Sequence, residues 1–81
     1  MSAAEDIVVA ALADVAPELE VDDLDPQASL RDGADLDSMD FLAFVAAVSE
    51  AIGADIPENE YPQLDGLAKA AAYVALRVST A

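Results

Sequence analysis

Asp37-Ser38-Met39-Asp40 is the stretch of this sequence that decides its fold. It lies where a polar segment gives way to a run with apolar residues at helical spacing. Asp37 is a predicted N-cap, and Asp40 falls in the first helical turn, where a carboxylate interacts favourably with the helix dipole. The hydroxyl of Ser38 therefore stands between two carboxylates at the start of a predicted helix. This placement favours a serine that another protein modifies.

The predicted helix runs from about Ser38 to Ala51, and Gly53 stops it. At about 100° per residue, one stripe of this helix is apolar and should face the core, with Leu42 on its flank. The stripe consists of Phe41, Phe44, Val45, Val48 and Ile52. The opposite face carries Met39, Asp40, Ala43, Ala46, Ala47 and Glu50.

Upstream, the capping box Ser2-Ala3-Ala4-Glu5 predicts the start of a first helix, and Pro17 ends it. Its apolar stripe consists of Ile7, Val8, Ala11, Leu12 and Val15. From Glu18 to Leu36 the chain is acidic but contains apolar residues spaced as anchors, which predicts an ordered loop packed across a bundle. These anchors are Leu19, Val21, Leu24, Leu30 and Leu36.

Downstream, residues 57–61 predict little more than one turn of helix, closed by Pro62. A last helix is expected from about Asp65 or Gly66 to Val78. Its predicted inward face consists of Leu67, Ala71, Val74 and Val78, and its outward face of Lys69, Tyr73 and Arg77. We therefore expect an all-α fold: a four-helix bundle with a long first loop and a short third helix, forming a single domain over residues 1–81.

The amino-acid composition excludes several classes of function. The 81 residues contain no cysteine and no histidine, which removes the commonest zinc ligands and the commonest general base. We therefore expect a protein that is not an enzyme and has no catalytic residues. The net charge is −14, which argues against nucleic acid as a partner and favours electropositive protein surfaces. Residues 1–65 hold all 17 acids and Arg31, giving −16, whereas residues 66–81 carry +2.

Clustered aspartates raise the question of calcium. An EF-hand loop needs an acidic first residue and glycine at its sixth position. The three glycines would start such loops at Ala28, Val48 and Tyr61, none of which is acidic. We therefore expect no metal site. No stretch approaches the 18 or more apolar residues of a membrane span, and no secretory signal is evident, so we expect a cytoplasmic protein.

The segment from Ser29 to Leu42, which reads SLRDGADLDSMDFL, resembles the acyl carrier proteins. The resemblance continues through Ile52-Gly53-Ala54-Asp55-Ile56-Pro57 and from Leu67 to Val74, so that it covers roughly residues 5–78. Ser38 matches the family's attachment serine, and the resemblance implies a covalent 4′-phosphopantetheine arm taken from coenzyme A. It also implies a monomeric, non-catalytic carrier of acyl thioesters for fatty acid, polyketide or specialised lipid biosynthesis.

The resemblance implies two further sets of residues. A phosphopantetheinyl transferase and acyl-loading and acyl-processing enzymes with basic or apolar docking patches would bind Asp35, Asp37, Met39, Asp40, Ala43, Ala46 and Glu50. An acyl cleft would be lined by Val45, Val48, Ile56, Leu64, Ala70 and Val74.

Several positions depart from the family pattern. Met39 replaces the usual leucine, Ala43 and Ser49 stand where fatty-acid-synthase carriers are usually acidic, and Ala46 replaces a usual methionine. These departures predict more apolar, less salt-sensitive docking and question a housekeeping fatty-acid role. They favour instead a role in a dedicated polyketide, specialised lipid or aminoacyl pathway.

Two alternatives remain open on the sequence. The same scaffold carries aminoacyl or peptidyl groups, and composition also allows an unmodified acidic protein-interaction bundle. In that second case Ser38 is an ordinary residue at a helix start, and the aspartates are caps and solvated surface.

Overall fold

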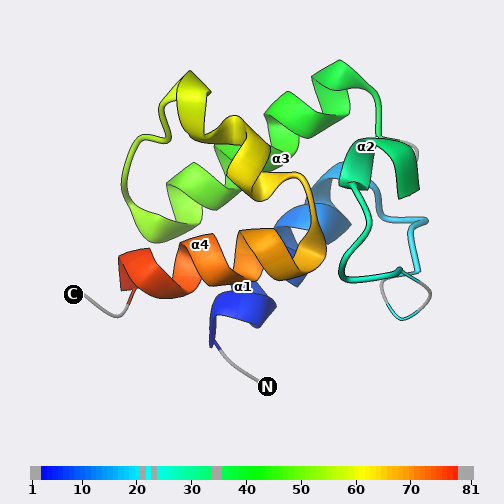
Figure 1. Cartoon of the computed structure of the whole chain (residues 1–81), viewed down its shortest axis with the longest axis horizontal. Helices are drawn as coiled ribbons and strands as arrows, with labels where there is room; N and C mark the ends of the chain where they lie inside the picture. The colour runs from blue at the N-terminus through cyan, green and yellow to red at the C-terminus, as the bar shows by residue number, and fades with distance from the viewer. Residues whose placement is uncertain (1–2, 21, 23, 34–35, 79–81) are drawn as a thin grey trace.

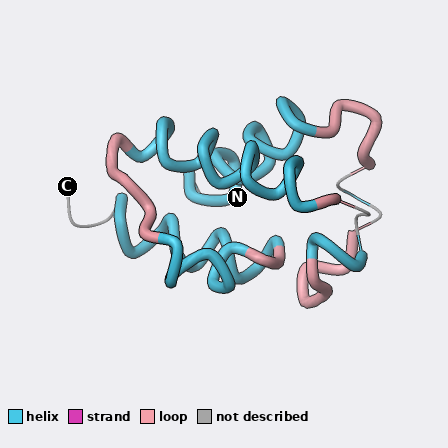
Figure 2. The backbone as a smooth tube through the Cα atoms, turned by 90° about the horizontal axis from the view of Figure 1, so that it is seen from above, coloured by secondary structure: helices cyan, strands magenta, loops and turns pink. Residues whose placement is uncertain are grey.

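The computed structural model describes residues 3–20, 22, 24–33 and 36–78, and their regular elements are all helical (Figures 1 and 2). The elements, in chain order, are α1 (Ala3–Val15), α2 (Leu30–Gly33), α3 (Ser38–Ile52), the 3-10 helix η2 (Glu58–Leu64) and α4 (Leu67–Val78). The predicted all-α class is confirmed. The expected count of four helices differs, because α2 adds a turn of helix inside the predicted first loop.

Three helices enclose the core. Helix α1 packs against both α3 and α4, and these three lie close together in Figure 1. Val8 of α1, Phe44 and Val48 of α3, and Val74 of α4 are each 0% exposed. The apolar stripes predicted from helical spacing therefore meet at one core, and burial of these side chains supplies the main stabilisation of the fold.

Helix boundaries follow local sequence signals. The side chain of Asp37 accepts a hydrogen bond from the Asp40 amide at 2.8 Å, as predicted for an N-cap. At the other end, Gly53 has φ of 70°, the left-handed conformation that a glycine adopts most easily, and its amide bonds to the Glu50 and Ser49 carbonyls. Helix α1 ends at Val15, two residues before Pro17. Ser2, the predicted cap of α1, lies outside the described residues.

The long connection between α1 and α3 is ordered over its described part. Leu30 and Leu36 are buried in the core, and Leu19 and Leu24 pack against it at partial exposure. Val21, the remaining predicted anchor, lies outside the described residues. Apolar anchors thus hold this segment on the bundle, as the spacing predicted.

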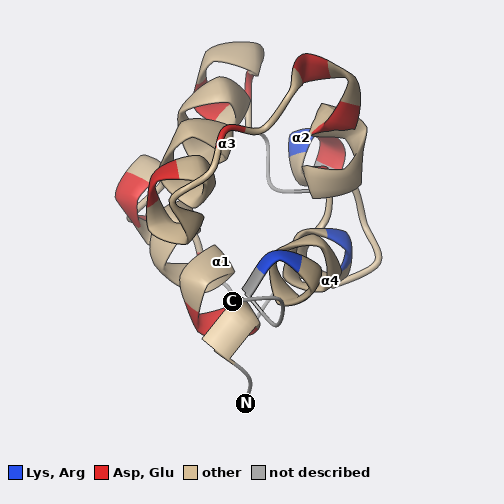
Figure 3. Cartoon of the chain, turned by 90° about the vertical axis from the view of Figure 1, so that its left-hand side faces the viewer, with Lys and Arg blue, Asp and Glu red and all other residues tan. Residues whose placement is uncertain are grey.

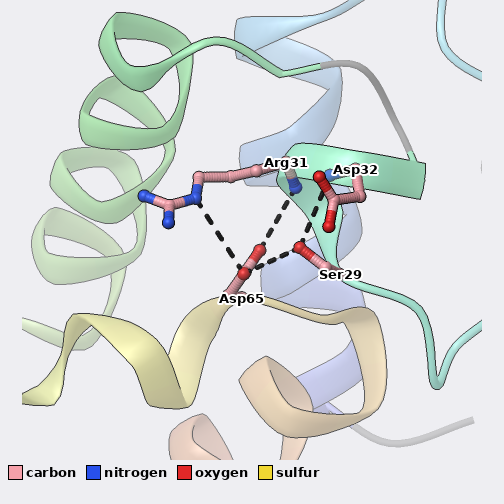
Figure 4. Close-up of polar contacts among 4 residues, drawn as sticks. All are labelled: Ser29, Arg31, Asp32 and Asp65. Atoms are coloured by element: carbon pink, nitrogen blue, oxygen red, sulfur yellow. Dashed lines mark hydrogen bonds and ion pairs between the residues drawn. The ribbon is translucent and has the colours of Figure 1, made fainter.

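Polar contacts tie the same connection to the start of α4 (Figure 4). The Ser29 hydroxyl donates to Asp65 Oδ2 at 2.7 Å, and the Arg31 amide donates to Asp65 Oδ1 at 3.2 Å. The Ala68 amide donates to the Pro26 carbonyl at 3.0 Å. A side chain at Gly66 would approach the Ala28 carbonyl to 3.3 Å, so this glycine permits the close contact.

The third helix is longer than predicted. We expected Pro62 to close it, but η2 continues through Pro62 to Leu64. A proline lacks an amide proton yet keeps a carbonyl, and the Pro62 carbonyl accepts a hydrogen bond from the Asp65 amide at 3.3 Å. The 3-10 helix therefore tolerates the proline, and Leu64 at its end is fully buried.

The prediction that Tyr73 points outward was wrong. Its side chain is only 4% exposed, and its hydroxyl donates a hydrogen bond of 2.5 Å to Glu60 of η2. Arg77 donates to the same carboxylate at 2.8 Å and stacks over the Tyr73 ring at 4.2 Å. Helix η2 covers this face of α4. Spacing along α4 alone could not reveal that another helix buries Tyr73.

Charge is distributed unevenly over the fold. Acidic residues appear on α1, α3 and η2, whereas α4 carries basic residues (Figure 3). Among the described residues, no helix is both long and apolar enough to cross a membrane. The same residues contain no cluster of three or more acidic, histidine or cysteine side chains arranged to hold a metal ion.

Candidate functional site

Ser38 is the first residue of α3, and its side chain is exposed. Asp37 is also exposed, and its carboxylate accepts a hydrogen bond from the Asp40 amide, which fixes the first turn of the helix. Amide groups in the first turn of a helix favour negative charge, because they have no partners within the helix. The Ser38 hydroxyl is therefore accessible to a modifying protein, at a position suited to a phosphate ester.

Most of the predicted partner-binding residues are exposed on α3 or at its N-cap. Met39 is 79% exposed and Asp40 is half-buried. The exposed members of the predicted set are Asp37, Met39, Ala43, Ala46 and Glu50. Asp35, the remaining member, lies outside the described residues. We call the six described members, from Asp37 to Glu50, the α3 surface.

Leu42 belongs to the same surface but was missed, because its position on the flank of the apolar stripe suggested partial burial. The structure leaves it 51% exposed. Its spacing was an available signal, since a residue four positions after Ser38 lies on the same side of a helix. Leu42 and Met39 together give the start of α3 an apolar character.

The predicted acyl-cleft residues are core residues in this structure. Each is at most 8% exposed, and four of them are fully buried. The set comprises Val45, Val48, Ile56, Leu64, Ala70 and Val74. They come from α3, η2, α4 and the segment before η2, so the fold does bring the predicted residues to one region of the interior.

An open cavity lies directly beside Ser38. It has a volume of about 230 Å³ and is bounded by α3, η2 and the long connection. Its lining consists of Arg31, Ser38, Phe41, Leu42, Tyr61, Pro62 and Asp65. The ring centroids of Phe41 and Tyr61 are 6.5 Å apart in an edge-to-face arrangement, so two packed aromatic rings form part of the cavity wall.

Arg31 brings a positive charge to this cavity. Its guanidinium carbon lies 5.4 Å from the centroid of the Phe41 ring, within the range of a cation–π interaction. Its Nε lies 4.0 Å from Asp65 Oδ2, at the limit of an ion pair. The sequence showed Arg31 to be the sole basic residue in residues 1–65, but its proximity to Ser38 depends on how the long connection folds back.

The fold and the site define the class of protein: a small helical domain that exposes a serine at a helix N-terminus beside a mostly apolar cavity. A family model described as "Phosphopantetheine attachment site" matches residues 6–74, and the chain belongs to this family. It is a carrier protein for covalently bound 4′-phosphopantetheine. A comparison with curated proteins finds no match to the chain.

Membership of this family indicates the general classes of protein that bind its carrier domains. Carrier domains of this family interact with phosphopantetheinyl transferases and with enzymes that process acyl groups, and they are generally not catalysts themselves. The residues beside Ser38 fit the group, because an exposed hydroxyl, a helix N-terminus and a cationic guanidinium suit a phosphate ester.

Proposed function

We propose that Ser38 is the attachment serine and that the protein carries acyl intermediates on the arm attached there. The observation that carries this proposal is the exposed Ser38 hydroxyl at the first position of α3, next to the 230 Å³ cavity. The arm supplies a terminal thiol that holds an acyl group as a thioester. All 81 residues would form one carrier domain acting as a monomer.

The chain's own residues would present this serine rather than activate it. The Asp37 cap fixes the first turn of α3 with a bond of 2.8 Å, so the Ser38 hydroxyl is held at a defined place. The chain contains no histidine that could act as a base. We therefore expect activation of the hydroxyl to come from the transferase, and this carrier to serve as its substrate.

The α3 surface favours partners with apolar docking patches. Met39 is 79% exposed and Leu42 is 51% exposed, while Ala43 and Ala46 add small apolar side chains between them and Glu50. Only Asp37, Asp40 and Glu50 contribute charge to this surface among its described members. We propose a dedicated polyketide, specialised lipid or aminoacyl pathway in preference to general fatty-acid synthesis.

Intact-mass measurement tests the attachment. The protein is incubated with coenzyme A, magnesium and a broad-specificity phosphopantetheinyl transferase, together with Ser38→Ala and Ser49→Ala. Ser49 lies on the same helix, so its variant is a matched loss of one hydroxyl. We expect one adduct on wild type and Ser49→Ala and none on Ser38→Ala. A folded wild-type protein that gains no adduct would favour an unmodified acidic interaction bundle.

A further inference from the structure

Arg31 is the one basic residue in residues 1–65 of the sequence, and it shares the wall of a cavity with Ser38. We propose that the Arg31 guanidinium binds the phosphodiester formed on Ser38, and that it leaves the Asp65 carboxylate to do so. The inference rests on the proposed attachment at Ser38. In this proposal Arg31 binds the arm, and modification of Ser38 moves the Arg31 guanidinium from Asp65 to the phosphodiester.

The placement of the guanidinium supports this exchange. Figure 4 shows the Arg31 side chain extending from α2 toward α3. Its guanidinium carbon lies 5.4 Å from the ring centroid of Phe41, which is three residues after Ser38 on α3. Residues three apart on a helix are surface neighbours, with Cβ atoms about 5–6 Å apart. The cation therefore lies beside the helical turn that begins with Ser38.

The present contact between Arg31 and Asp65 is weak. The Nε to Oδ2 distance is 4.0 Å, and the Arg31 side chain is 56% exposed. Exposed ion pairs of this kind contribute about 0–1 kcal/mol. Asp65 keeps its hydrogen bonds from the Ser29 hydroxyl at 2.7 Å and the Arg31 amide at 3.2 Å when the guanidinium leaves. The exchange therefore costs little and preserves the tie between the long connection and α4.

The phosphodiester needs a cation at this place more than the unmodified serine does. Asp37 and Asp40 flank Ser38 in the first turn, and an added negative charge is repelled by each carboxylate, at about 1 kcal/mol per pair at 4 Å in water. A guanidinium binds phosphate oxygens through two parallel charge-assisted hydrogen bonds, a geometry that the lysine ammonium lacks. Arg31 is placed to offset the repulsion.

Nitrogen-edited NMR of the arginine side chains tests the exchange without any mutation. The chain has two arginines, Arg31 and Arg77, so the spectrum contains one Nε–Hε signal from each. We expect conversion to the modified form, followed by removal of free coenzyme A, to shift the Arg31 signal and leave that of Arg77 in place. In Asp65→Asn, the Arg31 signal should differ from wild type before modification and coincide with it afterwards.

Phosphorus NMR of the modified protein gives a second readout. Arg31→Gln should shift the phosphodiester resonance, whereas Lys69→Gln, which removes the same charge from the exposed face of α4, should not. An adduct of correct mass with an unchanged Arg31 signal would overturn this inference and leave attachment at Ser38 intact. Absence of an adduct would overturn both, and intact mass separates the two failures.

Discussion

The Ser29 hydroxyl donates a hydrogen bond of 2.7 Å to the Asp65 carboxylate, joining residues 36 positions apart in the sequence. The same carboxylate accepts the Arg31 amide at 3.2 Å, so one side chain before α4 fixes both Ser29 and the first turn of α2 (Figure 4). Since Arg31 and Asp65 also line the cavity beside Ser38, this contact positions part of the candidate site.

Removing the Ser29 hydroxyl should destabilise the fold modestly. Ser29→Ala loses a partly buried hydrogen bond to a charged acceptor and the weaker 3.4 Å bond from the Asp32 amide, so the free energy of unfolding should fall by about 1–2 kcal/mol. Asp65→Ala loses two hydrogen bonds to its carboxylate and the contact with the Arg31 guanidinium, and should cost more. Urea denaturation followed by circular dichroism measures both. Asp55→Ala removes the same charge from an exposed position and should change stability by less than about 0.5 kcal/mol. Equal effects of Asp55→Ala and Asp65→Ala would contradict the assigned role.

The Asp37 cap should contribute to stability separately from its charge. Asp37→Ala loses the 2.8 Å hydrogen bond to the Asp40 amide and should lower the free energy of unfolding by about 1 kcal/mol. Asp37→Asn keeps an oxygen acceptor for that amide and should retain most of the stability while removing the charge. Thermal denaturation at matched ionic strength compares the two variants. A loss in Asp37→Asn as large as in Asp37→Ala would show that charge dominates.

Tyr73 should make stability fall at alkaline pH. Burial, reinforced by the hydrogen bond to Glu60, raises the pKa of the Tyr73 hydroxyl above its ordinary value of 10.0. The folded state therefore favours the neutral phenol, and its contribution is fully present below about pH 10 and is lost as pH rises through the raised pKa. Urea denaturation across this pH range measures the decline.

A phenylalanine variant serves as the control for that measurement. Tyr73→Phe should be less stable than wild type at neutral pH, because the Glu60 carboxylate loses a hydrogen bond, and its decline above pH 10 should be shallower. An unchanged alkaline decline in Tyr73→Phe would rule out Tyr73 as its source.

Docking of partners should depend on apolar contacts more than on charge. Met39→Ala and Leu42→Ala remove the large exposed apolar side chains near Ser38, so each should weaken binding to the transferase several-fold with little effect on stability. Leu76→Ala removes a 66% exposed leucine from α4 and should leave binding unchanged. Binding is measured by titration calorimetry.

The same binding measurement at increasing salt concentration tests how much charge contributes to partner affinity. Within α3 itself only Asp40 and Glu50 are charged, so affinity for a cognate partner should fall only slightly from low to high salt. A steep loss of affinity with salt would contradict an apolar interface and restore the acidic residues as the main determinants of docking.

The sequence by itself determined the features that depend on neighbouring residues. The start of α3 with its Asp37 cap, the end at Gly53, and the buried stripe that includes Phe44 and Val48 follow from spacing and local hydrogen-bonding groups. The position of Ser38 as the first residue of that helix follows from the same local signals, and its candidacy for attachment came from the resemblance of residues 29–42 to the acyl carrier proteins.

Only the tertiary structure decided the surroundings of that serine. Helical spacing predicted that Tyr73 points outward, but η2 covers it. The position of Arg31 depends on a hydrogen bond from its amide to Asp65, which is distant in the sequence. The cavity beside Ser38 likewise combines α3, η2 and the connection around α2. Such contacts form because distant segments share one core, and periodicity within a single helix contains no information about which segment will cover it.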